Sequence, residues 1–174
     1  MLEAIKKRRS CRNFNSLKPV EEEKLNEVIE AGLNAPSAKN TQEGIIIAIT
    51  NKVVRDKVSL INKRIMGVDK DIDPFYGAPV ILVVAARKWA LSQYDGSTMI
   101  ENMLVEATNQ SLASIWIHRA KQEFEDPEFI DLLKDTGIDF NEYEGIGHVA
   151  LGYPSDDNTY SDKEIKEGRV FYVK

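Results

Sequence analysis

The sequence predicts an α+β fold of mixed α/β type, in which a central antiparallel-to-mixed sheet is flanked by helices. Three observations predict it. Apolar segments of strand length alternate along the chain with amphipathic segments of helix length. One strand-length segment, residues 79–85, is apolar throughout, which is typical of a strand covered on both faces. The sequence has no internal repeat, low-complexity tract or linker, so we expect one domain spanning residues 1–174.

The first 65 residues contain three predicted helices and one predicted strand. Residues 2–9 have a short helical pattern, and residues 21–33 have a clear amphipathic one with apolar positions at helical spacing. Pro19 precedes this second helix, and three glutamates give its first turn the negative charge that a helix N-terminus favours. Residues 45–49 are rich in β-branched side chains and predict a strand, and residues 52–65 predict a helix.

The second half contains the longest predicted helix, residues 95–113, and its apolar positions indicate a central place in the fold. A loop rich in Asp, Pro and Gly precedes the covered strand at 79–85. The remaining predicted elements are a helix at 125–135 and strands at 114–117, 147–153 and 170–173.

Composition and charge argue against several classes of protein. Hydrophobic residues make up 43% and charged residues 29%, which is ordinary for a folded globular chain. The formal net charge of -5 disfavours binding to nucleic acid or to an anionic membrane. The longest apolar stretch, residues 78–86, is too short to span a bilayer, and the N-terminus lacks the apolar core of a signal peptide. The single cysteine, Cys11, excludes an internal disulfide, so we expect a cytoplasmic protein.

The usual signatures of side-chain catalysis are missing from the sequence. With two histidines and one cysteine, a metal site built from His and Cys clusters is not expected. There is neither a Gly-x-Ser-x-Gly nucleophile motif nor a glycine-rich phosphate loop. His148 lies in a strand pattern and is interpreted as a structural histidine, whereas His118 ends a strand, where it can face a cleft. So few acid–base groups favour chemistry supplied by an organic cofactor.

A basic cluster near the start of the chain supports the hypothesis of an organic cofactor. Arg8, Arg9 and Arg12 place three guanidinium groups beside the hydroxyl of Ser10. Guanidinium forks match phosphate oxygens, and a serine hydroxyl adds another donor. A compact phosphate suits the cluster better than a long polyanion, because the chain as a whole is negative. The alternative is a solvated basic helix end, since Lys and Arg are common near helix C-termini.

Five segments, in order along the chain, resemble the nitroreductase family of FMN enzymes. They are Arg-Arg-Ser-x-Arg-x-Phe at 8–14, Pro-Ser-x-x-Asn-x-Gln at 36–42, Phe-Tyr-Gly-Ala-Pro-Val-Ile at 75–81, Ser-Leu-Ala-Ser-Ile-Trp-Ile at 111–117 and Gly-His-Val-Ala-Leu-Gly-Tyr-Pro at 147–154. Together they cover nearly the whole chain. The resemblance implies a nitroreductase-like fold and an obligate homodimer whose main dimer helix is residues 95–113.

The resemblance also implies two FMN sites at the dimer interface. It assigns the basic cluster to the phosphate and ribityl chain of FMN, with Arg12 also able to reach the ring and stabilise its charge on reduction. It assigns the Pro-Ser-x-x-Asn-x-Gln loop to the flavin of the partner subunit. The implied cofactor-binding residues are Arg8, Arg9, Ser10, Arg12, Pro36, Ser37, Asn40, Gln42, Tyr76, Gly77, Trp116, Arg119 and Arg169.

The function implied by the resemblance is that of an FMN-dependent oxidoreductase. Electrons would pass from NAD(P)H through the flavin to a small acceptor such as a nitro compound or quinone, and no side chain would serve as a catalytic base. Three departures bear on the pocket: Glu43-Gly44 stand where family members often carry a proline and an aromatic residue, Ser111, Ala113 and Ser114 replace a glycine-rich helix end, and the region 56–73 is short, which predicts a reduced lid.

Alternatives to these assignments remain open from the sequence alone. Pro36 and Ser37 can end one helix and cap the next turn, and Asn40 and the Tyr76-Gly77 pair are ordinary turn residues. Trp116, between two isoleucines, is favoured as a core residue, and Arg169 can be a solvated loop charge. The protein can also be a non-catalytic FMN reservoir or sensor. A nucleic-acid-binding module is disfavoured by charge and by the lack of interleaved aromatic and basic residues.

Overall fold

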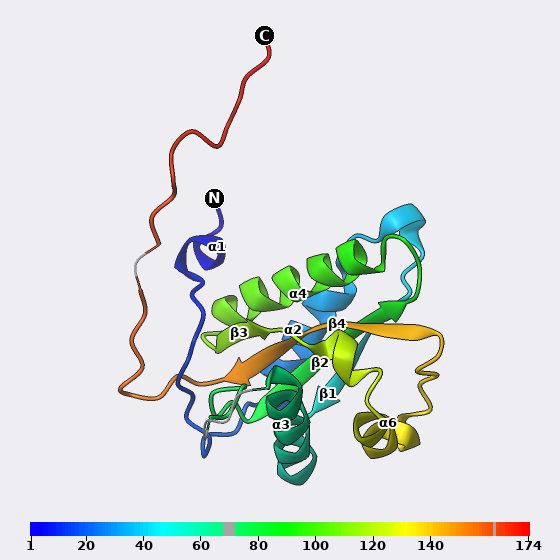
Figure 1. Cartoon of the computed structure of the whole chain (residues 1–174). Coiled ribbons are helices and arrows are strands. Elements are labelled where there is room, and N and C mark those ends of the chain that lie inside the picture. The colour runs from blue at the N-terminus through cyan, green and yellow to red at the C-terminus, as the bar shows by residue number, and fades with distance from the viewer. Residues whose placement is uncertain (68–71, 162) are drawn as a thin grey trace.

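The computed structural model describes residues 1–67, 72–161 and 163–174, and its centre is a four-stranded antiparallel sheet (Figure 1). The strands are β1 (Gly44–Ile49), β2 (Val80–Arg87), β3 (Ala113–Ile117) and β4 (Tyr143–Gly152), in the spatial order β1-β2-β4-β3. Each neighbouring pair of strands is antiparallel. Together with the flanking helices, this sheet confirms the predicted α+β fold.

Helices precede the first strand and separate later strands along the chain. They are α1 (Glu3–Lys7), α2 (Glu22–Leu33), α3 (Lys52–Met66), α4 (Ser92–Asn109), α5 (Ala120–Glu123) and α6 (Pro127–Leu133), with short 3₁₀ turns at Ala38–Asn40 and Lys134–Thr136. The predicted helices at 2–9, 21–33 and 52–65 are confirmed within a few residues at their ends. The predicted helix at 125–135 divides into α6 and a 3₁₀ turn, and the short helix α5 was not predicted.

The sheet separates two hydrophobic layers, and strand β2 takes part in both (Figure 1). Leu82 and Val84 pack with the side chains of α2 and α4, whereas Ile81 and Val83 face the layer that contains α3 and α6. All four side chains are completely buried. The continuous apolar pattern of this strand therefore has the predicted cause, since both faces of the strand are covered.

Helix α3 has local signals at both of its ends. It begins after Asn51, whose side-chain oxygen accepts hydrogen bonds from the backbone N–H groups of Val53 at 2.9 Å and Val54 at 3.2 Å. It ends at Gly67, which has a φ of 69°, a left-handed conformation that glycine adopts without steric cost. These signals fix the helix that later presents Arg55 and Asn62 to the site.

Helix α4 begins at Ser92, before the predicted residue 95, and ends at Asn109 rather than at residue 113. Ser111 adopts a left-handed backbone with a φ of 59°, and the N–H of Leu112 donates to the carbonyl of Ala107 at 2.8 Å. This closing turn is a Schellman motif, which usually has glycine at the left-handed position. The residues after it begin strand β3.

The predicted terminal strand at 170–173 is wrong. Within the described parts of the chain these residues join no strand, and Phe171 and Val173 are almost fully exposed. Figure 1 shows the tail leaving the body of the protein and running past the N-terminus. A strand needs a neighbouring backbone for its hydrogen bonds, and residues 170–173 have none among the residues that the structure describes.

Candidate functional site

The basic segment near the start of the chain is fixed against strand β3. Ser10 forms a parallel bridge with Ser114, and the N–H of Cys11 donates to the Ser114 carbonyl at 3.0 Å. Cys11 is completely buried and Phe14 nearly so. Burial raises the pKa of the Cys11 thiol, despite a hydrogen bond from the thiol to the carbonyl of Asn13. The segment is therefore anchored by small and apolar side chains.

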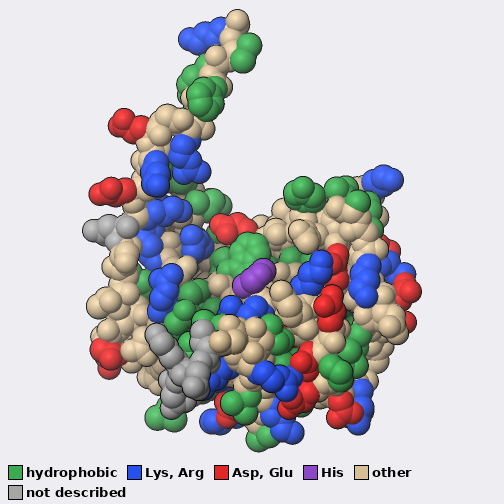
Figure 2. All heavy atoms as spheres, viewed as in Figure 1, with side chains coloured by type: hydrophobic (Ala, Val, Ile, Leu, Met, Phe, Trp, Pro, Cys, Tyr) green, Lys and Arg blue, Asp and Glu red, His purple; other side chains and the backbone are tan. Residues whose placement is uncertain are grey.

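A cavity that we call the basic cradle lies beside this segment. Its volume is about 340 Å³, and it is lined by Arg8, Arg9, Ser10 and Arg12 together with Ser161, Lys163 and Glu164 from the tail. Figure 2 shows Lys and Arg side chains gathered where the tail meets the body. Four cations and two hydroxyl groups face a single carboxylate in this lining. Such a donor set fits a compact anion such as a phosphate group.

The cations of the cradle are weakly compensated by the protein. The Arg9 guanidinium donates to the backbone carbonyls of Lys6 and Arg8, both at 2.8 Å, so its charge is not neutralised. The nearest carboxylate oxygen of Glu101 is 4.0 Å from Nε of Arg8, and Glu101 is largely exposed. The Arg12 side chain has no hydrogen bond or ion pair with residues 1–67, 72–161 or 163–174. The cradle therefore retains its positive charge.

A second hollow, which we call the central cavity, borders the cradle. Its volume is about 580 Å³, and it is lined by Arg12, Asn13, Met66, Ile72, Asp73, Pro74, Tyr76, Ile115, Trp116, Ile117, His118 and Arg119. Arg12 lines both cavities. Trp116 is 41% exposed, so the prediction that it is a core residue is wrong. Because side chains alternate along strand β3, Trp116 points away from the buried Ile115 and Ile117.

Two residues on the wall of the central cavity have left-handed backbones although neither is glycine. Tyr76 has a φ of 56° and Arg119 has a φ of 83°. Such conformations are costly for a residue with a β-carbon and persist where the surroundings impose them, often at functional sites. Helix α3 contacts Arg119 directly through Asn62 and reaches the turn of Tyr76 through Asp73.

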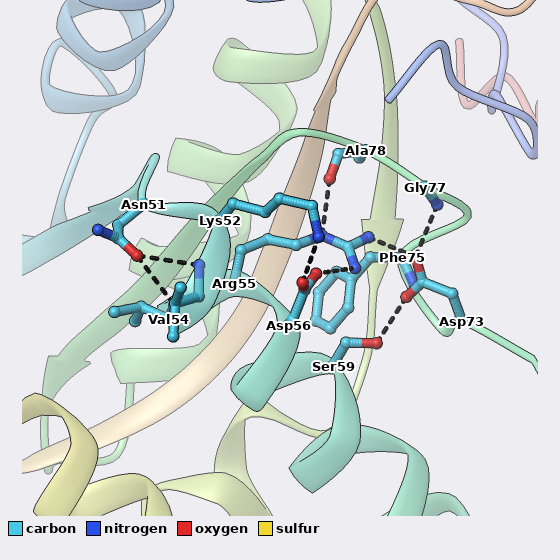
Figure 3. Close-up of polar contacts among 11 residues, drawn as sticks. Asn51, Lys52, Val54, Arg55, Asp56, Ser59, Asp73, Phe75, Gly77 and Ala78 are labelled. Atoms are coloured by element: carbon cyan, nitrogen blue, oxygen red, sulfur yellow. Dashed lines mark hydrogen bonds and ion pairs between the residues drawn. The ribbon is translucent and has the colours of Figure 1, made fainter. Parts of the chain in front are cut away.

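The turn that carries Tyr76 is held by the carboxylate of Asp73 (Figure 3). Asp73 accepts hydrogen bonds from the backbone N–H of Phe75 at 2.9 Å and that of Gly77 at 2.7 Å. It also accepts from the Ser59 hydroxyl at 2.6 Å and pairs with Arg55. Burial alone would raise the pKa of Asp73, but these partners, led by Ser59 and Arg55, hold that pKa below its ordinary value.

Arg55 extends the same network to the end of the turn. It is almost fully buried, and its Nε donates to the carbonyl of Ala78 at 2.8 Å (Figure 3). Ala78 precedes strand β2, so Arg55 and Asp73 together join the turn to both helix α3 and the sheet. The position of Tyr76 at the cavity is therefore set by an ion pair between the buried Arg55 and the partly buried Asp73.

The loop at residues 36–42 lies at a different pocket from the cradle and the central cavity. Its pocket has a volume of about 220 Å³ and is lined by Leu33, Ala35, Pro36, Ser37, Gln42, Gly44, Asp95 and Met99. The Ser37 hydroxyl accepts from the N–H of Gln42 at 3.0 Å, and the Gln42 amide donates to Asn40 at 3.0 Å. Asn40 and Gln42 both have positive φ values, 54° and 52°. Internal hydrogen bonds therefore hold a strained loop on the surface.

The structure groups the predicted site residues into three sets. Arg8, Arg9, Ser10 and Arg12 form the cradle, and Arg12 meets Tyr76, Trp116 and Arg119 at the central cavity. Gly77 lies in the Tyr76 turn with a φ of 79°, without lining the cavity. Pro36, Ser37 and Gln42 line the separate pocket, with Asn40 exposed nearby. Arg169 is exposed on the tail and joins none of these sets.

Some lining residues were not predicted from the sequence. Ser161, Lys163 and Glu164 belong to the tail, whose approach to the cradle no local pattern indicates. Asp73 did carry a sequence signal, because it stands directly before a proline. An Asp in this place is typical of a turn in which the Asp side chain accepts a hydrogen bond from the backbone N–H two residues later. Residues 68–71, within the segment where a reduced lid was predicted, lie outside the described residues.

The departures from the family pattern have structural consequences. Glu43 faces Arg87, with Nε 3.4 Å from the carboxylate, and does not line the pocket of the 36–42 loop. Gly44 lies against Met99, since a Cβ there would be 2.2 Å from the Met99 sulfur. The narrow space beside Gly44 therefore excludes a larger side chain at that position without repacking.

Two properties of the described residues bear on other functions. Within residues 1–67, 72–161 and 163–174, no group of three or more His, Cys, Asp or Glu side chains is arranged to hold a metal ion. Among the helices that the structure describes, none is long and apolar enough to cross a membrane.

Comparisons with known proteins agree with the geometry. The model of the nitroreductase family matches residues 5–153. The chain is similar to a solved nitroreductase with bound FMN from Bacteroides fragilis, with 29% identity and a TM-score of 0.91 over 99% of this chain and 97% of that one. It is also similar to a nitroreductase family protein from Clostridium difficile, with 28% identity and a TM-score of 0.69 over 90% and 85% of the two chains.

A third solved structure shares the fold at lower identity. A nitroreductase with bound FMN from Desulfitobacterium hafniense is 22% identical, with a TM-score of 0.80 over 100% of both chains. No match was found among curated proteins.

Proposed function

The chain belongs to the nitroreductase family, and we propose that it is an FMN-dependent oxidoreductase that passes electrons from NADH or NADPH to a small acceptor. Nitro compounds and quinones are the acceptor classes that we favour. The single observation that carries the proposal is the position of Arg12, which lines both the basic cradle and the central cavity. One ligand with a phosphate at one end and a planar ring at the other suits this arrangement.

The residues of the two cavities fit FMN in their chemistry. The cradle offers guanidinium, ammonium and hydroxyl donors for a phosphate dianion, and its positive charge is weakly compensated. The central cavity offers Trp116, Tyr76 and apolar side chains for a flat aromatic ring. The solved structures from Bacteroides fragilis and Desulfitobacterium hafniense contain bound FMN, which supports the same assignment here.

FMN, when bound, supplies the redox chemistry by accepting a hydride and giving up electrons. The chain's own residues then orient and stabilise. Arg8, Arg9 and Ser10 would hold the phosphate, and Arg12 would place a positive charge near the ring, where negative charge collects on reduction. No side-chain general base is required, which accounts for the small number of histidines.

The remaining predicted residues belong to a proposed homodimer. Pro36, Ser37, Asn40 and Gln42 would contribute to the flavin site of the partner subunit, since their loop lies at a separate pocket from the central cavity. Helix α4 would be the main dimer helix. Gly77 would keep the Tyr76 turn close to the ring, and Arg169 would add a phosphate contact once the tail is placed on a partner.

The test is the spectrum of the purified protein and its response to reduced nicotinamides. We expect a yellow protein whose released chromophore is FMN and whose flavin absorbance bleaches when NADH or NADPH is added without oxygen. Reoxidation by a nitro compound or a quinone should restore the absorbance. A bound flavin that neither nucleotide reduces would instead identify an FMN reservoir or sensor. A colourless protein that does not bind added FMN would refute both the oxidoreductase and the reservoir or sensor.

A further inference from the structure

A chain of buried polar side chains lies behind the central cavity. Asn62 of α3 and Glu123 of α5 are completely buried. The Asn62 amide donates to Oε1 of Glu123 at 2.5 Å and to the carbonyl of His118 at 3.1 Å. On its other side, the oxygen of Asn62 accepts from Nε of Arg119 at 2.8 Å. Asn62 therefore connects the interior with two residues that line the cavity.

His148 completes this chain, and its hydrogen bonds fix the number of protons. Its Nδ1 lies 3.3 Å from the carbonyl oxygen of Ile117, and its Nε2 lies 2.6 Å from Oε2 of Glu123. A carbonyl oxygen only accepts, so Nδ1 carries a proton. The bond between Nε2 and Glu123 contains one further proton, on either the imidazole or the carboxyl. In both cases the Glu123–His148 pair has no net charge.

Because this pair is neutral, it does not neutralise the charge of Arg119. Glu123 is the acidic group nearest to Arg119 in the network, but its charge is balanced within its own pair. No other carboxylate contacts Arg119 in the parts of the chain that the structure describes. The guanidinium is therefore anchored by a neutral amide and keeps its full positive charge at the cavity wall.

The backbone of Arg119 shows that its position is imposed. Its φ of 83° is left-handed and unfavourable for an arginine, and α5 begins directly after it. Asn62 holds this strained turn at two points. Its oxygen accepts from Nε of Arg119, and its amide group donates to the carbonyl of the preceding residue, His118. A network that served only to stabilise the core would not require an arginine with a strained backbone at the cavity wall.

We propose that Asn62 is a positioning residue that holds Arg119 at the central cavity, where the uncompensated guanidinium stabilises negative charge on the bound ring. The inference rests on the proposed function, since the ring is that of FMN. Glu123 and His148 fix Asn62 and remain neutral as a pair, so the charge of Arg119 acts on the cavity.

The test is the midpoint potential of FMN in the purified holoprotein, measured by anaerobic titration against a redox dye. Asn62→Leu and Arg119→Met should each make the potential more negative. The affinity for reduced FMN should fall about tenfold more than that for oxidised FMN, as expected for a lost interaction with a charged group. The double variant should shift no further than Arg119→Met alone, because Asn62 acts through Arg119.

Two further variants separate this role from a merely structural one. Arg64→Met removes a cation of α3 that pairs with Asp126 and Glu128 outside the cavity, and it should leave the potential unchanged. Arg119→Gly removes the guanidinium and introduces glycine, which tolerates the left-handed backbone. It therefore remains informative if Asn62→Leu does not fold. It should shift the potential as Arg119→Met does.

The failures are distinguishable. An FMN-loaded parent with the same potential as Arg119→Gly overturns this inference alone. Additive shifts in the double variant likewise overturn the role of Asn62, since they place its effect outside Arg119. A parent that binds no FMN overturns the proposed function and this inference with it.

Discussion

The carboxylate of Asp73 accepts a hydrogen bond from the backbone N–H of Gly77 at 2.7 Å and thereby closes the turn that presents Tyr76 to the central cavity. The same carboxylate pairs with the buried Arg55. The turn is consequently held by charge as well as by backbone geometry, and its stability should depend on the ionisation of one residue.

We predict that Asp73→Asn lowers the free energy of unfolding at neutral pH and that the difference from the parent narrows in acid. The pKa of Asp73 is below its ordinary value in the folded chain. Its stabilising contribution is therefore fully present above the unfolded-state pKa of about 3.9. That contribution disappears as the pH falls through the lower folded-state pKa. Urea unfolding over a range of acidic pH values measures the difference.

Asp131→Asn is the control for this prediction. Asp131 is exposed and pairs with Lys134 on the surface, so its replacement should have little effect at any pH. A gap between Asp73→Asn and the parent that stays constant down to the lowest pH would contradict the assignment.

We predict that Arg12→Ala binds FMN more weakly than the parent. Loss of a hydrogen bond to a charged group costs about 1.5–3 kcal/mol, so the dissociation constant should rise by roughly tenfold or more. Arg12→Lys should lie between the two, since it keeps the charge but loses the planar fork. Quenching of flavin fluorescence on binding provides the measurement. Arg64→Ala, which removes an exposed arginine elsewhere, should bind FMN like the parent. If Arg12→Ala bound FMN as tightly as the parent, Arg12 would not belong to the site.

We predict that Gly145→Ala is strongly destabilising. A Cβ at Gly145 would lie 2.2 Å from the carbonyl oxygen of Ala120 and 2.4 Å from its carbon, so backbone would have to move. Overpacking of this kind costs about 1–3 kcal/mol. Thermal unfolding followed by circular dichroism gives the comparison with the parent. A Cβ at Gly137 would meet no atom of the described residues within 4 Å, so Gly137→Ala should lose only the smaller cost of its left-handed backbone. Equal losses for the two variants would argue against the clash.

The fold could be predicted further than the site because its signals are local. The apolar run of β2 and the spacing of apolar residues in α2 each depend on a few neighbouring residues. The basic cluster was visible for the same reason, since Arg8 to Arg12 lie on one anchored segment. The end of α4 was misplaced because Ser111 adopts a conformation that sequence patterns assign to glycine.

The buried network behind Arg119 had no comparable signal. Asn62, Glu123 and His148 come from two helices and a strand that are distant along the chain. His148 could be interpreted as structural from its strand pattern, and the structure confirms this, but its partners could not be named. The apolar neighbours of Trp116 favoured a core position over the site position that the resemblance implied, whereas only the arrangement of β3 beside the cavity shows that Trp116 is partly exposed.

The end of helix α4 supplies the last prediction, that Ser111→Gly stabilises the protein. Ser111 occupies the left-handed position of a Schellman turn, in which its N–H donates to Thr108 at 3.1 Å and the next N–H donates to Ala107 at 2.8 Å. A side chain in this conformation costs about 1–2 kcal/mol, and glycine removes most of that cost while adding some entropy to the unfolded chain. The free energy of unfolding in urea should therefore rise by up to about 1 kcal/mol. Ser97→Gly, in the regular part of the same helix, should instead lower it by about 0.5–1 kcal/mol. If both variants lost stability alike, the turn at Ser111 would not be strained, and the serine at this position would have to be explained by its side chain.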